Sequence, residues 1–129
     1  MQMNAYLNFD GRCEEAFQFY ARCFGGTIES MIPHAGTPAA EHVPAEWHEK
    51  IMHATLRLPG GSVLMGSDTS PGGYRTPGGF ALALGPDEPA EAERLFAALA
   101  DGGVVQMPIQ ETFWSARFGM VTDRFGIPW

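Results

Sequence analysis

The sequence predicts an α+β protein in which one strand–helix–strands module occurs twice. The first observation is an internal repeat: Glu14–Ile28 and Glu91–Val105 both read as an amphipathic helix that ends in Gly-Gly and precedes a β-branched strand. The second observation is that a strand pattern precedes each helix, and the third is that further strands follow it. Together these patterns predict the order β-α-β-β-β and then β-α-β-β.

In the first module, the predicted strand Met3–Phe9 alternates apolar and polar residues, as a strand with one buried face does. The helix that follows ends at Gly25, which is suited to the left-handed position after a helix. Its apolar residues at helical spacing are Ala16, Phe19, Tyr20, Cys23 and Phe24. The other predicted strands are Thr27–Ile32, Lys50–Leu58 and Ser62–Ser67.

The second module is predicted to begin with the strand Phe80–Leu84, and its helix ends at Gly102. The apolar residues of this helix are Ala92, Leu95, Phe96 and Leu99. Predicted strands follow at Val104–Ile109 and Trp114–Thr122. The last residues, 127–129, read as the beginning of one more strand. We therefore expect either a truncated last strand or a sheet position that is filled in another way.

A length of 129 residues suits a single domain, 1–129. Within it we expect module 1 at 1–67, a linker at 68–78 that is rich in Gly, Pro, Ser and Thr, and module 2 at 79–129.

Charge and composition exclude several classes of partner. The net charge is −7 and the eight Lys and Arg residues are scattered, so the chain lacks the basic surface that nucleic acid or an anionic membrane requires. No apolar run approaches the length of a membrane span, and the first residues do not resemble a secretory signal. Cys13 and Cys23 lie too far apart on one helix for a disulfide, and free thiols predict a cytoplasmic protein.

Nearly the whole chain resembles a known family. The strings YLNFDGRCEEAFQFY, FGGTIESM, AEWHEKIMHATLRL and TFWSARFGMVTDRFGIPW are similar to the PhnB-like branch of the vicinal oxygen chelate superfamily, which includes glyoxalase I, bleomycin-resistance proteins and extradiol dioxygenases. The resemblance implies two βαβββ modules that form curved mixed sheets around a cup, with helices on the outer faces. It also implies a homodimer.

In that superfamily a metal ion in the cup is held by residues from four strands. The matching positions fall on Asn4 (or Ala5), near Met65, on Phe80 and beyond Trp129. Asn is a weak neutral ligand, Met is a soft one, and Phe is none, whereas a site needs three or four converging donors. We therefore expect no metal at the superfamily's usual site, and no cofactor.

The candidate ligand-binding residues are aromatic, apolar and polar side chains that would line such a cup. They are Tyr6, Asn8, His53, Met65, Phe80, Trp114 and Phe118. The aromatic members suit plain core packing equally well. His53 shares a strand face with Thr55 and is the best single candidate for a general base, although a structural histidine is the alternative.

Two further sets of reactive side chains carry weaker interpretations. His34, His42 and His48 lie with several glutamates in a long loop that lacks known metal-ligand spacing, so a lid over the cup or a dimer contact is favoured over metal binding. Cys13 and Cys23 are both weak candidates for a reactive thiol. Cys13 is the better of the two, because it lies near a helix start beside Arg12.

Three functions remain open from the sequence. The first is binding of a small organic molecule in a metal-free cup. The second is a metal-dependent lyase, isomerase or dioxygenase of the glyoxalase type, or an enzyme that works through His53. The third is a dimeric structural or regulatory protein, since one fold hosts many functions.

Overall fold

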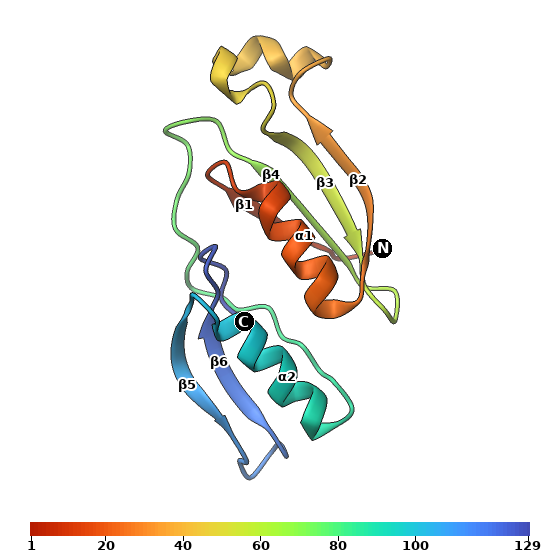
Figure 1. Ribbon diagram of the computed structural model, residues 1–129, viewed down its shortest axis with the longest axis vertical. Coiled ribbons are helices and arrows are strands. Elements are labelled where there is room, and N and C mark those ends of the chain that lie inside the picture. Colours follow the sequence, from red (N-terminus) through yellow and green to blue (C-terminus); the bar gives the residue numbers. More distant parts are fainter. The chain divides into compact units, whose positions relative to one another are not determined.

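The computed structural model describes residues 1–129 and contains six β-strands and two α-helices (Figure 1). The chain divides into two compact units, Met1–Arg75 (unit 1) and Thr76–Trp129 (unit 2), and each is described by itself. The mixed α+β class with curved, open sheets is as predicted. Neither α-helix has the length and apolar character of a membrane-spanning segment.

Unit 1 is a four-stranded mixed sheet with the strand order β1-β4-β3-β2 and one covering helix. Its elements are β1 (Ala5–Phe9), α1 (Cys13–Phe24), β2 (Thr27–Pro33), β3 (Ile51–Arg57) and β4 (Val63–Asp68). Strands β1 and β4 are parallel, and β3 is antiparallel to both β4 and β2. All four predicted strands are confirmed, with ends that differ by one or two residues.

The core of unit 1 lies between α1 and one face of this sheet. Leu7, Phe9, Ala54 and Leu56 are buried on the strands, and Tyr20 is fully buried on the helix. The helical face differs from the predicted one, because Cys13 and Phe17 are fully buried whereas Phe19 and Phe24 are only half-buried. The helix ends as predicted, with Gly25 at a φ of 71°.

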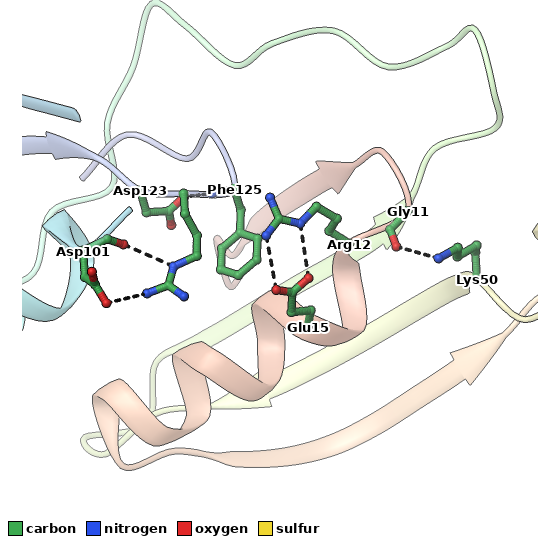
Figure 2. A network of polar contacts seen from close by, with 8 residues as sticks. Gly11, Arg12, Glu15, Lys50, Asp101, Asp123 and Phe125 are labelled. Atoms are coloured by element: carbon green, nitrogen blue, oxygen red, sulfur yellow. Dashed lines mark hydrogen bonds and ion pairs between the residues drawn. The ribbon is translucent and has the colours of Figure 1, made fainter. Parts of the chain in front are cut away.

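The long loop between β2 and β3 contains two 3₁₀ helices, Pro38–His42 and Ala45–Trp47. The ring of Trp47 lies over Gly11, and the Lys50 ammonium donates a hydrogen bond of 3.0 Å to the Gly11 carbonyl (Figure 2). The loop is therefore anchored to the turn between β1 and α1.

Unit 2 has a two-stranded antiparallel sheet and one helix. Its elements are α2 (Pro89–Ala100), β5 (Val104–Gln110) and β6 (Phe118–Thr122). Strand β6 begins later than the predicted Trp114, because Thr112 and Ser115 close a turn in which the Ser115 amide donates to the Thr112 hydroxyl. The ion pair between Arg124 and Asp101 ties the end of β6 to the end of α2 (Figure 2).

The predicted strand Phe80–Leu84 does not form. Residues 81–84 keep the alternating burial of a strand, but Phe80 is 51% exposed, and only the Leu82 amide makes a backbone bond, to the Pro128 carbonyl at 2.9 Å. In unit 1 the counterpart of this segment is β1, and its neighbour in the sheet is β4, which separates β1 from β3. In unit 2 the residues that match β4 are 127–129, and they pair with Phe80–Leu84 through the single Leu82 bond.

Candidate functional site

The candidate site in unit 1 is the face of the sheet opposite α1, which we call the open face. It carries Tyr6, Asn8, His53, Thr55 and Met65, the alternate residues of their strands whose neighbours are buried against α1. Pairing in the sheet places Met65 directly between Tyr6 on β1 and Thr55 on β3. The four unit 1 residues predicted for ligand binding therefore share one surface.

A chain of hydrogen bonds crosses this face. The Tyr6 hydroxyl lies 3.1 Å from His53 Nδ1, and His53 Nε2 lies 3.0 Å from the Thr55 hydroxyl. The Tyr6 and His53 rings are also in contact, with centroids 5.7 Å apart. Both imidazole nitrogens thus have a hydroxyl partner, which fixes the orientation of the ring. In a neutral imidazole one nitrogen donates to its hydroxyl partner and the other nitrogen accepts from its own.

The exposure of these side chains leaves the chain of hydrogen bonds accessible. Tyr6 is 46% exposed, Asn8 is exposed, and His53, Thr55 and Met65 are half-buried. A hydroxyl that already bonds to His53 keeps a further donor or acceptor position for a ligand. The open face can therefore hold a molecule that combines an apolar body with a hydrogen-bonding group.

In unit 2 the predicted residues are divided. Trp114 and Phe118 are in ring contact, with centroids 5.4 Å apart, and both line a cavity of about 500 Å³ beside α2. Phe80 is 51% exposed and does not line this cavity. Residues of α2 and of the segment before it also line the cavity. They were not predicted as ligand-binding residues, because the candidates for ligand binding were residues of predicted strands.

The residues present do not fit the metal centre of the resembled superfamily. Asn4 is exposed ahead of β1, Met65 offers only a thioether, and Phe80 offers no donor atom. No group of three or more His, Cys, Asp or Glu side chains lies close enough together to hold a metal ion. We therefore assign no chemical step to a metal.

Two of the three loop histidines, His34 and His48, have structural partners. His34 is buried, and its Nδ1 donates to the Lys50 carbonyl at 2.8 Å. His48 Nε2 donates to the Ala40 carbonyl at 3.1 Å. These bonds hold the loop in its fold.

Cys13 is not a reactive thiol. It is fully buried, and burial together with the nearby Asp68 carboxylate raises its pKa far above the ordinary value of a cysteine. A reactive thiol needs the opposite shift. Proximity to Arg12 and to a helix start, which the sequence shows, is therefore outweighed by burial and by Asp68.

Two buried carboxylates were not singled out from the sequence. Asp68 accepts hydrogen bonds from the Cys13 amide at 3.0 Å and the Ile51 amide at 2.8 Å. Asp123 accepts from the Phe125 and Ile127 amides and from the Trp129 indole. Asp68 holds distant segments together, and Asp123 fixes the turn at 123–129, so both are structural groups and not candidates for acid–base catalysis.

Comparison with known proteins agrees with this geometry. Residues 2–129 match the Glyoxalase/Bleomycin resistance protein/Dioxygenase superfamily. Protein YjdN of Escherichia coli (strain K12) is 36% identical over 137 residues, which cover 100% of this chain and 92% of that protein.

Solved structures show the same fold. Protein PA1353 from Pseudomonas aeruginosa is 50% identical with a TM-score of 0.87, and the match covers 100% of this chain and 94% of that one. A PhnB protein from Bacillus cereus is 24% identical with a TM-score of 0.82, covering 100% and 96% of the two chains. At that identity the second likeness supports the fold alone.

Proposed function

The chain belongs to the glyoxalase/bleomycin resistance protein/dioxygenase superfamily, and from this premise we propose that it binds a small organic molecule on the open face without a metal ion. The family prediction is confirmed, but membership does not choose a reaction, because the fold hosts many functions. The observation that carries the proposal is the hydrogen-bonded chain Tyr6–His53–Thr55 on an accessible sheet face.

The chain of hydrogen bonds supplies orientation. Since His53 is bonded at both nitrogens, its ring and the Tyr6 hydroxyl are held in place before a ligand arrives. A ligand group that bonds to Tyr6 or Thr55 then meets a preorganised partner, which lowers the entropic cost of binding.

Met65 supplies an adaptable apolar surface at the centre of the same face. Its thioether lies between the Tyr6 and Thr55 strands, where it can pack against a ring or an alkyl group. Asn8, two residues from Tyr6 on β1, adds an amide at the edge. In unit 2, Trp114 and Phe118 remain proposed ligand contacts, and so does Phe80.

The test is a thermal-shift screen of metabolites and antibiotics, followed by NMR of methionine methyl groups. A ligand at 100 times its dissociation constant stabilises the protein by about 2.7 kcal/mol. We expect the Met65 methyl signal to shift on binding and that of Met31 to stay unchanged, because Met31 pairs with Ala54 on the face toward α1.

The matched control uses two histidines. His53→Ala should abolish the shift, whereas His42→Ala should retain it, because His42 is exposed in a 3₁₀ helix of the loop. Binding that survives both His53→Ala and Tyr6→Phe would overturn the assignment to the open face. A screen in which no compound stabilises the protein would favour a structural or regulatory role.

The metal-free part of the proposal has its own measurement. We expect elemental analysis of protein from metal-replete cells to find no stoichiometric Zn, Ni, Mn or Fe, because Asn4, Met65 and Phe80 form no donor set. One bound ion per chain would contradict the metal-free proposal and would favour the metal-dependent enzyme instead.

We also propose a cytoplasmic homodimer. Support for a dimer comes from the edge strand β5, which pairs only with β6 and exposes Val104 and Val105. Support for the cytoplasm comes from Cys13 and Cys23, which are reduced cysteines. Light scattering should give twice the 14.0 kDa mass of one chain, and cell fractionation should recover the protein with cytoplasmic markers.

A further inference from the structure

Besides the residues already placed there, the open face carries a charged pair. Among the residues of strands β1 to β4, charged side chains occur at Glu29, Arg57 and Asp68, and Asp68 is buried. Arg57 is two residues from Thr55 on β3, so these two side chains lie on the same face of the sheet. Arg57 is therefore the one cation that the strands present on the open face.

A β-bulge in β2 directs Glu29 to the same face. The register of β2 on β3 shifts between Ile28 and Ser30, so Glu29 is an extra residue without a partner on β3. A bulge changes the direction in which the side chain of the extra residue points. Here the Glu29 carboxylate reaches the Arg57 guanidinium, and Oε1 accepts a hydrogen bond from Nε at 2.7 Å.

This ion pair leaves most of the guanidinium available to a ligand. It uses Nε of Arg57, so the four hydrogens of the two Nη atoms remain for a further acceptor. The side chains of Arg57 and Glu29 are 52% and 41% exposed, so the pair contributes little to stability. It does restrict the rotamers of Arg57, and so it holds the planar fork of donors in place before an oxyanion binds.

The neighbours of Arg57 join this guanidinium to the proposed ligand site. Val63 on β4 pairs with Arg57, and Met65 pairs with Thr55, so β4 offers an apolar strip beside both polar residues. Two residues of a strand span about 7 Å, which is the separation of Thr55 from Arg57 along β3. A ligand whose acid group meets Arg57 can therefore rest its apolar body on Val63 and Met65. Its hydroxyl or carbonyl group then reaches Thr55 or Tyr6.

Given the ligand site proposed above for the open face, on which this inference rests, we propose that its ligand is a carboxylic acid. Arg57 binds the carboxylate through its Nη atoms, and Glu29 is a positioning residue that holds the guanidinium. A guanidinium and a carboxylate match as a bidentate pair. The net charge of −7 opposes a dianionic phosphate more strongly than a singly charged carboxylate.

The experiment measures the binding of three acids by NMR titration of the Met65 methyl signal. The acids are para-hydroxyphenylacetate and its two homologues that are one and two methylenes longer, and each is compared with its primary amide. At least one acid should bind about tenfold more tightly than its amide, because the amide lacks the charge that strengthens the bonds to Arg57.

Two arginine variants test whether this preference comes from Arg57. Arg57→Gln should lower the affinity for the acid about tenfold and leave the affinity for the amide unchanged. Arg22→Gln is the matched control, because it removes one positive charge from an exposed residue in the last turn of α1, and it should bind the acid as the wild type does. Both variants should unfold near the wild-type temperature without ligand, because exposed ion pairs contribute little to stability.

Two substitutions of Glu29 test its role in positioning. Both remove the negative charge, but Glu29→Gln keeps an amide oxygen that can accept from Nε of Arg57, whereas Glu29→Ala does not. Glu29→Gln should therefore bind the acid more tightly than Glu29→Ala, and the amide should bind both variants equally. Equal binding of the acid by the two variants would overturn the positioning role.

The failure of the carboxylate subsite is distinguishable from failure of the open-face site. Equal binding of acid and amide, with both lost in His53→Ala, would overturn the carboxylate subsite alone. Acid binding that Arg57→Gln leaves unchanged would do the same, and so would tighter binding of the matching primary amine that is lost in Glu29→Ala. If none of these probes binds and the thermal-shift screen finds no other compound that does, both proposals are overturned. If the screen finds only neutral ligands of the open face, the carboxylate subsite alone is overturned.

Discussion

Asp68 is a buried side chain that joins three segments of unit 1. It ends β4, and its carboxylate accepts from the first amide of α1, at Cys13, and the first amide of β3, at Ile51. The residue before α1, Arg12, makes no capping bond through its side chain, so Asp68 takes the role of a cap from a distant strand. We expect Asp68→Ala to destabilise the protein by roughly 2–5 kcal/mol, since two buried donors lose their acceptor.

Denaturant unfolding measures this effect against two variants. Asp68→Asn keeps one acceptor oxygen and should cost less than Asp68→Ala, whereas Asp10→Ala removes an exposed carboxylate and should change stability by less than about 0.5 kcal/mol. Equal stability of Asp68→Ala and Asp10→Ala would show that the two hydrogen bonds contribute nothing.

The buried Cys13 thiol makes stability depend on alkaline pH. Its pKa is raised in the folded state by burial and by Asp68, so below pH 9.0, the ordinary value, it is neutral in both states and contributes no difference. Above that pH the unfolded chain ionises and the folded one does not, so folding loses about 1.4 kcal/mol per pH unit. The stability difference between wild type and Cys13→Ala should narrow at that rate above pH 9 in urea titrations. A difference that is constant with pH would contradict the raised pKa.

Among the site residues, the sequence could predict neighbours on one strand but not across strands. His53 and Thr55 are two residues apart in a strand, so their shared face follows from the alternation of side chains. The contact of His53 with Tyr6 depends on β4 being inserted between β1 and β3. No local pattern specifies that order, and the same holds for Asp68 and its partners.

At the scale of elements, the packing of α1 on the sheet depends on close approach at Gly66. A Cβ at this position would lie 2.8 Å from the Leu7 carbonyl oxygen and 2.9 Å from the Phe17 ring. We expect Gly66→Ala to cost about 1–3 kcal/mol, because backbone on one side and a buried ring on the other cannot both move away.

Gly78→Ala is the matched control for this substitution. A Cβ there meets no atom within 4 Å and the backbone is not left-handed, so the change should be nearly neutral in thermal unfolding. If Gly66→Ala melted at the wild-type temperature, the contact between α1 and β4 would be looser than described.

The predicted elements are confirmed where a local residue pattern determines the element. They are wrong where pairing with another strand determines it. Gly25 ends α1 through its left-handed conformation, which the sequence alone reveals. The strand expected at Trp114–Thr122 is shortened by a turn centred on Thr112 and Ser115. The strand expected at Phe80–Leu84 has the right residue pattern, but a strand also needs a neighbour along its length.

At the scale of the whole molecule, the two units differ in how completely they bury a core. Unit 1 covers one face of four strands with α1, and Phe9, Phe17 and Tyr20 are almost completely buried. Unit 2 is shorter, has two paired strands, and holds the cavity beside α2. Small domains have marginal stability because they bury a smaller share of their surface. An open cavity therefore lowers the stability of the shorter unit most.

We therefore expect the fragment Met1–Arg75 to fold alone and the fragment Thr76–Trp129 to fail to do so. Circular dichroism should show a cooperative thermal transition for the first fragment and none for the second. A cooperative transition of Thr76–Trp129 would show that the core of this unit is sufficient for folding.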